Sequence, residues 1–177
     1  VSIGRELVDF TGNCGNISSG VGPFAIDEGL VRAVEPVTKV RIHNTNTGKI
    51  LIAEVPVQDG KARVKGDYKI AGVPGLGAKI MLDFAGTAGS ATGKMLPTGQ
   101  VRDRLNIEGF GGIEVSIVDV ANPMVFVRAE DLGLTGIETP AQINGNKEIL
   151  DLLEKIRGQA AVKIGMAKDE KDALENS

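Results

Sequence analysis

The sequence has few of the residues that usually carry redox, metal or stacking chemistry. Its 177 residues include one cysteine, one histidine, one tyrosine and no tryptophan, and only 3% of them are aromatic. A single cysteine excludes an internal disulfide framework, and one histidine with one cysteine is too few for a convincing zinc site. The hydrophobic core therefore has to be built from Val, Ile, Leu and Ala.

Excess positive charge and long apolar segments are missing as well. The net charge is −3 at pH 7 and the isoelectric point is about 5.3, which argues against nucleic acid and anionic membrane surfaces as partners. No run of ~18 apolar residues and no signal-peptide pattern is found. With 42% hydrophobic and 24% charged residues, the sequence predicts a globular cytoplasmic protein.

The only cysteine, Cys14, lies among small residues and asparagines at positions 11–20, directly ahead of a predicted helix. Unpaired N–H groups and the positive end of a helix dipole favour a thiolate at such a position, and they can hold a substrate carboxylate or an enolate oxygen. A lone cysteine among turn-forming residues is also a common small buried hydrophobe. Composition alone leaves both interpretations of Cys14 open.

The helix after Cys14 has an ambiguous start. Gly29 suits its C-terminal cap, and the apolar residues between positions 17 and 30 are typical of a buried helix. Pro23, however, lacks an N–H group and favours the first helical turn, which would delay the regular helix to about Gly22.

Short strands dominate the rest of the chain. They are predicted at 5–10, 37–44, 49–57, 61–65 and 78–84, and then at 104–107, 113–118 and 125–128. Turns at 45–48 and 59–60 make hairpins, and a helix capped by Asn146 is predicted at 147–164. The glycine-rich segment 85–93 is the predicted crossover between two halves, residues 1–88 and 89–177.

Several of these segments together resemble one family. Residues 13–16 (Asn-Cys-Gly-Asn) and 21–30 (Val-Gly-Pro-Phe-Ala-Ile-Asp-Glu-Gly-Leu) are similar to the signature of the PrpF family. That family comprises 2-methylaconitate cis–trans isomerase, 3-methylitaconate Δ-isomerase and 4-oxalomesaconate tautomerase. The similarity continues through residues 43–47, 96–99, 122–123 and 143–146, and residues 43–47 and 118–123 are most similar to the methylitaconate isomerase branch.

The resemblance implies a fold and an activity. The fold is α/β (α+β) and diaminopimelate epimerase-like, with two pseudo-symmetric halves, each a curved mixed β-sheet around a central helix, and an active site between them. The activity is a cofactor-independent isomerisation that shifts a proton and a double bond in an unsaturated di- or tricarboxylate. Family members are about twice as long, so this chain is expected to be the middle of a larger protein and inactive alone. The resemblance also implies that the first helix starts just after Cys14.

The resemblance also implies site residues. Cys14 is the candidate acid/base, and the N–H groups of Gly15 and Asn16 are placed to stabilise a dienolate. The other candidate substrate-binding residues are Asn13, Ser18, Thr98, Gly99 and Asn122. Asn122 before a proline is also typical of a plain turn, and Ser18 can merely satisfy backbone groups. Family members also use a lysine that would precede Val1, so the proton carrier stays open between that lysine and Cys14.

Two further residues, Lys94 and His43, are candidates for a functional role. Lys94 follows Gly93, but the spacing to Gly89 and the Met95 that follows exclude a phosphate-binding loop. Lys94 is either a ligand for a second carboxylate or a solvated loop lysine. His43, on a predicted strand, is interpreted as structural.

Two other functions remain open. An amino-acid epimerase of the same fold uses two opposed cysteines, of which this chain has one. A non-catalytic carboxylate-binding domain needs no reactive thiol. In each case the expected partner is a small carboxylate, with no metal, no cofactor, no nucleic acid and no membrane, and a homo-oligomer is compatible with all of them.

Overall fold

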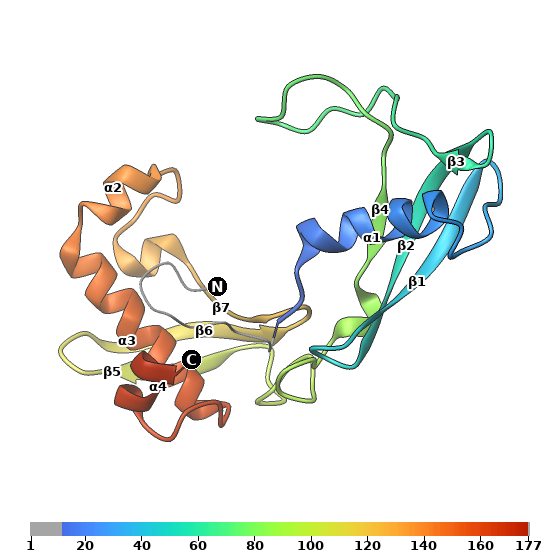
Figure 1. Cartoon of the computed structure of the whole chain (residues 1–177). Helices are drawn as coiled ribbons and strands as arrows, with labels where there is room; N and C mark the ends of the chain where they lie inside the picture. Colours follow the sequence, from blue (N-terminus) through green and yellow to red (C-terminus); the bar gives the residue numbers. More distant parts are fainter. Residues whose placement is uncertain (1–11, 177) are drawn as a thin grey trace. The chain divides into compact units, whose positions relative to one another are not determined.

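A computed structural model describes residues 12–176 of the chain (Figure 1). The strand predicted at 5–10 lies outside the described residues. The chain folds into two compact units, the first ending at Ser90 and the second beginning at Ala91. The assignment of residues 1–88 and 89–177 to two halves of a larger fold stays a prediction.

The first unit combines one helix with a small antiparallel sheet. Its elements are α1 (Gly15–Asp27), β1 (Val37–Asn44), β2 (Lys49–Gln58), β3 (Lys61–Ala62), β4 (Met81–Asp83) and the 3-10 turn η1 (Ala85–Thr87). β2 is central, because β1, β3 and β4 all pair with it. The predicted strand at 37–44 and the hairpin turn at 59–60 are confirmed, since Asp59 and Gly60 both have positive φ, as a tight two-residue hairpin turn requires.

α1 covers one face of this sheet. The inward residues of β2 alternate along the strand, and Leu51, Ala53 and Val55 are at most 1% exposed. Ile26 of α1 belongs to the same core cluster. A Cβ on Gly22 would lie 2.7 Å from Cγ2 of Val55, so the helix backbone approaches the strand as closely as it does only because residue 22 is glycine.

A second side of α1 is apolar too. Ile17, Val21 and Phe24 recur at intervals of four and three residues, which places them on one side of the helix. Ile17 is 73% exposed and Phe24 61% exposed. The helix therefore has two apolar faces, of which the described sheet covers one.

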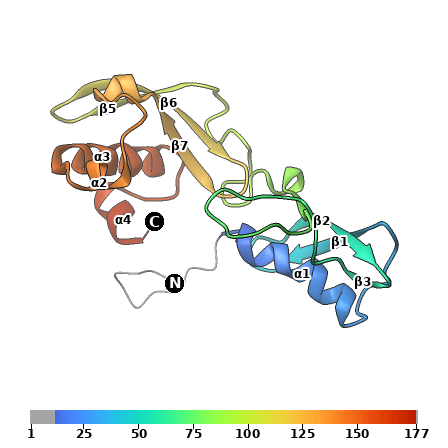
Figure 2. The same cartoon turned by 90° about the horizontal axis from the view of Figure 1, so that it is seen from above.

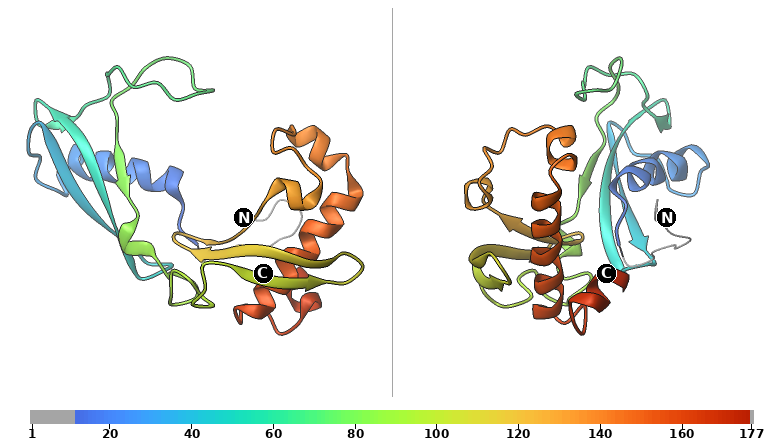
Figure 3. Two further views of the ribbon diagram at one scale, coloured as in Figure 1. Left: turned by 180° about the vertical axis from the view of Figure 1, so that it is seen from behind. Right: turned by 90° about the vertical axis from the view of Figure 1, so that its left-hand side faces the viewer.

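The second unit is a three-stranded antiparallel sheet with helices on one face. Its elements are β5 (Asp103–Ile107), β6 (Gly111–Asp119), β7 (Pro123–Val127), η2 (Ala129–Leu132), α2 (Pro140–Asn144), α3 (Lys147–Lys163) and α4 (Glu170–Asn176). Figures 2 and 3 show α3 lying across the sheet. Its buried residues Ile149, Ile156 and Ala160 form one cluster with the inward residues of β5 and β6.

Most elements predicted for this unit are confirmed. α3 begins after Asn146, whose side chain accepts a hydrogen bond from the Ile149 N–H at 3.2 Å. α2 was missed although its signal is present, because Thr139 and Gln142 form a capping box and Pro140 occupies the first turn. α4 was also missed.

Two strands of the first unit are shorter than predicted. Strands expected at 61–65 and 78–84 are observed as β3 and β4, of two and three residues. Between them, Gly66 packs directly against the backbone of Gly77, and Tyr68 bridges to Gly77. Glycines that require this close contact interrupt the strand ladder. None of the helices within residues 12–176 is both long and apolar enough to span a membrane.

Candidate active site

Cys14 is the residue that immediately precedes α1. Its backbone is extended, and its carbonyl accepts the first bond of the helix, from the Ser18 N–H at 3.0 Å. The side chain does not cap the helix and is exposed. The structure thus excludes the interpretation of Cys14 as a buried core residue in the described part of the chain. A start near Gly22 is also excluded, because the helix is continuous through Pro23.

The N-terminus of α1 presents donors beside this thiol. The N–H groups of Gly15, Asn16 and Ile17 precede the first intrahelical bond and project from the end of the helix. Gly15 has no side chain to block the approach of a ligand. A Cβ built on Gly15 would lie 3.9 Å from Cζ of Phe84, which is an ordinary van der Waals contact. Ser18 lies one turn further on and is 8% exposed, in contrast to the exposed Cys14, Gly15 and Asn16.

Asn13 ties this helix start to the β1–β2 turn. Its Oδ1 accepts hydrogen bonds from Asn44 Nδ2 at 2.7 Å and from Thr47 Oγ1 at 3.1 Å. Asn44 is itself oriented, because its Oδ1 accepts from the Asn46 N–H at 2.9 Å. Asn44 and Thr47 were not predicted as site residues, although both lie in the 43–47 segment that contributes to the family resemblance. His43, next to Asn44, is exposed on β1 and pairs in register with Ile50.

The second unit contains the other predicted residues. Thr98 and Gly99 lie in the segment that leads into β5, and Asn122 lies in the turn between β6 and β7. The Thr98 hydroxyl donates to Asp103 Oδ2 at 2.7 Å and accepts from the Gln100 N–H at 3.2 Å. Gly99 has φ of 77°, a value that favours glycine. Asn122 is exposed.

Two buried carboxylates hold the segment that contains Thr98 and Gly99. Asp119, the last residue of β6, accepts from the N–H groups of Ala91 and Thr92, and Asp103 accepts from Thr98. Lys163 Nζ lies 3.5 Å from Asp103 Oδ1. Sequence reasoning missed both aspartates, because nothing in the sequence shows that these acidic residues face the interior.

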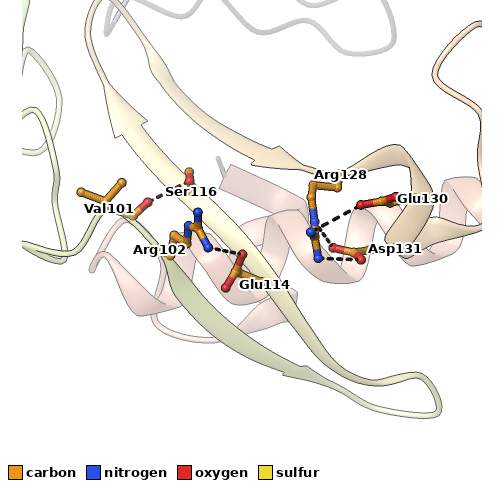
Figure 4. A network of polar contacts seen from close by, with 7 residues as sticks. All are labelled: Val101, Arg102, Glu114, Ser116, Arg128, Glu130 and Asp131. Carbon is orange, nitrogen blue, oxygen red and sulfur yellow. Dashed lines mark hydrogen bonds and ion pairs between the residues drawn. The ribbon is translucent and has the colours of Figure 1, made fainter.

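A separate polar network lies on the face of the β5–β7 sheet that α3 does not cover (Figure 4). Arg128 donates to both carboxylate oxygens of Asp131 at 3.0 Å, which raises the pKa of Arg128, and Arg102 Nη1 lies 3.5 Å from Glu114 Oε1. These charges neutralise one another in an open surface depression. Such exposed pairs contribute little to stability, and the arrangement is typical of a solvated surface.

The predicted residues therefore form two groups. Asn13, Cys14, Gly15 and Asn16 lie together at the start of α1, with Ser18 one turn away. Thr98 and Gly99 lie in a loop that is bonded to the ends of β5 and β6, and Asn122 follows β6 closely. The roles of all of these residues stay predictions. Within residues 12–176, no group of three or more His, Cys, Asp or Glu side chains is placed to hold a metal ion.

The chain matches one protein family along its whole length. All of residues 1–177 match the family described as PrpF protein. The chain is 63% identical over its whole length to 3-methylitaconate isomerase of Eubacterium barkeri, and covers 46% of that protein. It is 42% identical over 166 residues to 4-oxalomesaconate tautomerase of Pseudomonas putida, which spans 94% of the chain and 45% of the relative.

A solved structure extends this similarity to the fold. The crystal structure of methylitaconate-delta-isomerase matches with a TM-score of 0.88 at 62% identity, over 99% of this chain and 45% of that one. The chain therefore spans about half the length of the relatives it matches. Because the sequence match covers every residue and the fold is shared at high identity, the chain belongs to the PrpF family and has its diaminopimelate epimerase-like fold.

Proposed function

We propose that the complete protein containing this chain is an isomerase that moves a proton and a double bond within an unsaturated di- or tricarboxylate. Relatives named 3-methylitaconate isomerase, 4-oxalomesaconate tautomerase and 2-methyl-aconitate isomerase support this class. The observation that carries the proposal is the exposed Cys14 thiol at the N-terminus of α1. The 63% identity to 3-methylitaconate isomerase favours a methylitaconate-type substrate.

The chemistry requires stabilisation of an anion. A base removes a proton from the carbon next to the double bond, and the electron pair of that C–H bond becomes part of a dienolate. The same or another acid then returns a proton two carbons away, so the double bond shifts. Because the carbon acid is weak, hydrogen bonds to the dienolate oxygen are needed, and the N–H groups of Gly15 and Asn16 are suited to donate them.

The remaining expectations are part of the same proposal. The substrate is the small carboxylate partner, the reaction needs no added cofactor, and residues 1–88 and 89–177 belong to two halves of a larger fold. A cytoplasmic location is consistent with the net charge of −3 and the single cysteine. Residues 1–177 alone are expected to be inactive, because they cover 46% of the methylitaconate isomerase relative.

The test is turnover by the complete protein. Methylitaconate, methylaconitate and oxalomesaconate are each incubated in D2O without added metal or cofactor and followed by proton NMR. We expect conversion of at least one acid, with deuterium at the carbon that receives the proton. If the complete protein converts none of the three acids, the proposal is wrong.

A further inference from the structure

Asn44 lies on the last rung of the β1–β2 hairpin. It pairs in register with Lys49, and its carbonyl accepts from the Gly48 N–H at 2.8 Å, which closes the turn. Residues directly opposite each other on antiparallel strands project from the same face, so the Asn44 and Lys49 side chains leave the hairpin on the same side. Lys49 Nζ donates to the Ala88 carbonyl at 3.2 Å, and Asn44 Nδ2 donates to Asn13. This rung therefore anchors two segments that are distant from it in the sequence.

One backbone group sets the orientation of the Asn44 side chain. The Asn46 N–H lies 2.9 Å from Asn44 Oδ1, and an N–H group can only donate. Oδ1 is therefore the acceptor branch of this amide, and the donor branch, Nδ2, faces Asn13 at 2.7 Å. The Asn13 atom that meets it has to be an oxygen, and the Thr47 hydroxyl donates to that same oxygen at 3.1 Å. A single backbone N–H thus fixes the orientation of both amides.

Asn13 influences the site through its neighbour in the chain. It directly precedes Cys14, whose backbone is extended and whose carbonyl accepts from the Ser18 N–H at the start of α1. The Cys14 side chain makes no cap bond to the helix. The place of the thiol therefore depends on the residue before it and on the helix after it. Displacement of a reacting group by about 1 Å can lower a rate by about 10²-fold.

We infer that Asn44 is a positioning residue for the reaction at Cys14. It holds Asn13, so that the thiol and the N–H groups of Gly15 and Asn16 keep a fixed place at the start of α1. The inference rests on the proposed function, because the reaction that it serves is the proton transfer proposed for Cys14. Asn44 acts through Asn13 and does not touch the reacting atoms.

The variant Asn44→Ser separates this link from the turn. A serine hydroxyl can accept from the N–H two residues further on, as the asparagine oxygen does, but it is too short to reach Asn13. In the complete protein we expect kcat to fall at least about tenfold, because the helix start that carries the thiol moves. KM is expected to change less than kcat, since the N–H groups of Gly15 and Asn16 are proposed to stabilise a dienolate that forms only during the reaction.

Asn46→Ser is the matched control. It makes the same chemical change two residues further along the same turn, where the side chain is exposed, and it keeps the N–H that donates to Asn44. Both kcat and KM are expected to stay within about twofold of the unaltered protein, as is usual for a surface substitution.

A double-mutant cycle tests whether Asn44 acts through Asn13. Asn13→Ala removes the oxygen to which Asn44 donates. In that background, Asn44→Ser is expected to change kcat by less than about twofold, although alone it lowers kcat at least about tenfold. Chemical denaturation of the same proteins measures their stability. A purely structural Asn44 would lower stability and leave the kcat of the folded protein unchanged, which would contradict the inference.

A second readout needs no turnover. Iodoacetate and iodoacetamide alkylate the same thiolate, so the ratio of their rates at Cys14 reports how well a carboxylate is received beside it. Peptide mass spectrometry assigns the product to Cys14. Asn44→Ser is expected to lower this ratio at least about threefold, because hydrogen bonds from the displaced helix start to the carboxylate weaken, and Asn46→Ser is expected to preserve it. If the complete protein converts none of the three acids and this ratio still falls, the proposed function fails alone.

The inference is wrong if Asn44→Ser changes neither kcat nor the alkylation ratio. It is also wrong if the effects of Asn13→Ala and Asn44→Ser are additive, because Asn44 would then act by another path. An equal loss in Asn46→Ser would overturn it as well. If Asn44→Ser does not fold, Thr47→Val, which removes the second bond to the same Asn13 oxygen, takes its place in both measurements.

Discussion

The two units hold their candidate site residues with opposite kinds of chemistry. In the first unit, neutral groups hold the helix start, because the Asn13 amide is bonded to Asn44 and Thr47. In the second unit, buried carboxylates hold the 91–99 loop through Asp103 and Asp119.

This difference follows from electrostatics. A carboxylate beside Cys14 would oppose both a thiolate and an anionic substrate at the positive end of α1, whereas neutral amides and hydroxyls hold the helix start without that repulsion. The 91–99 loop has no helix end to supply donors, and its own N–H groups and hydroxyls satisfy the buried charges instead. The comparison predicts that changes beside Cys14 act on the proposed chemistry and that changes at Asp103 and Asp119 act on the stability of the 91–99 loop.

The largest expected effect comes from the thiol. In the complete protein, Cys14→Ala should lower kcat by at least about 10²-fold, because general acid–base groups contribute about 10²- to 10⁴-fold. Stability should change little, since the Cys14 side chain is exposed within residues 12–176. Steady-state kinetics and thermal unfolding measure the two quantities. A kcat within threefold of the unaltered protein would assign the proton transfer to another residue.

The second prediction displaces the helix that carries the thiol. Gly22→Ala should destabilise the complete protein by about 1–3 kcal/mol, because the new Cβ collides with Val55 in a packed interior. Gly20 is the matched control on the same helix, with nothing within 4 Å of its Cβ position. Gly20→Ala should stabilise by about 0.5–1 kcal/mol through helix propensity. Equal effects of the two changes in chemical denaturation would contradict the observed contact between α1 and β2.

The third prediction removes one neutral bond in the first unit. Thr47→Val deletes the hydroxyl that donates to Asn13 and should cost about 0.5–1.5 kcal/mol of stability. It should also lower kcat, because the helix start that carries Cys14 moves. Thr45→Val, two residues away on the same turn, is exposed and should stay within about 0.5 kcal/mol. A loss of stability with an unchanged kcat would show that this bond holds the turn without positioning the helix start.

The sequence predicts one of these arrangements better than the other. The helix start at Cys14 was predictable because the family signature is contiguous and the asparagines and glycines stand beside the cysteine. The Asn146 cap and the stripe from Ile149 were predictable for the same local reason. The roles of Asp103 and Asp119 were not, because burial of a carboxylate depends on the folded loop, and the N–H donors to Asp119 lie 27 and 28 residues away in the sequence. The truncated β3 and β4 depend likewise on contact between distant glycines.

The smallest expected effect tests whether carboxylates that hold loops must be buried. Like Asp119, Glu138 accepts hydrogen bonds from its own loop, from the N–H and hydroxyl of Thr135 and from the Gly136 N–H, but it is only half-buried. The bonds from Thr135 lower the pKa of Glu138 to about 2, from a model-compound value of 4.5. Because the folded pKa lies below the unfolded one, the charged form stabilises the loop fully above the unfolded value. This stabilisation is lost as the pH falls through the folded pKa.

A side-chain NMR titration should therefore show Glu138 still ionised at pH 3, and Glu138→Gln should differ in stability from the unaltered protein at pH 7 but not near pH 2. Thr135→Val removes one donor and should move the titration towards the ordinary value. A midpoint near 4.5 in the unaltered protein would show that water screens these bonds.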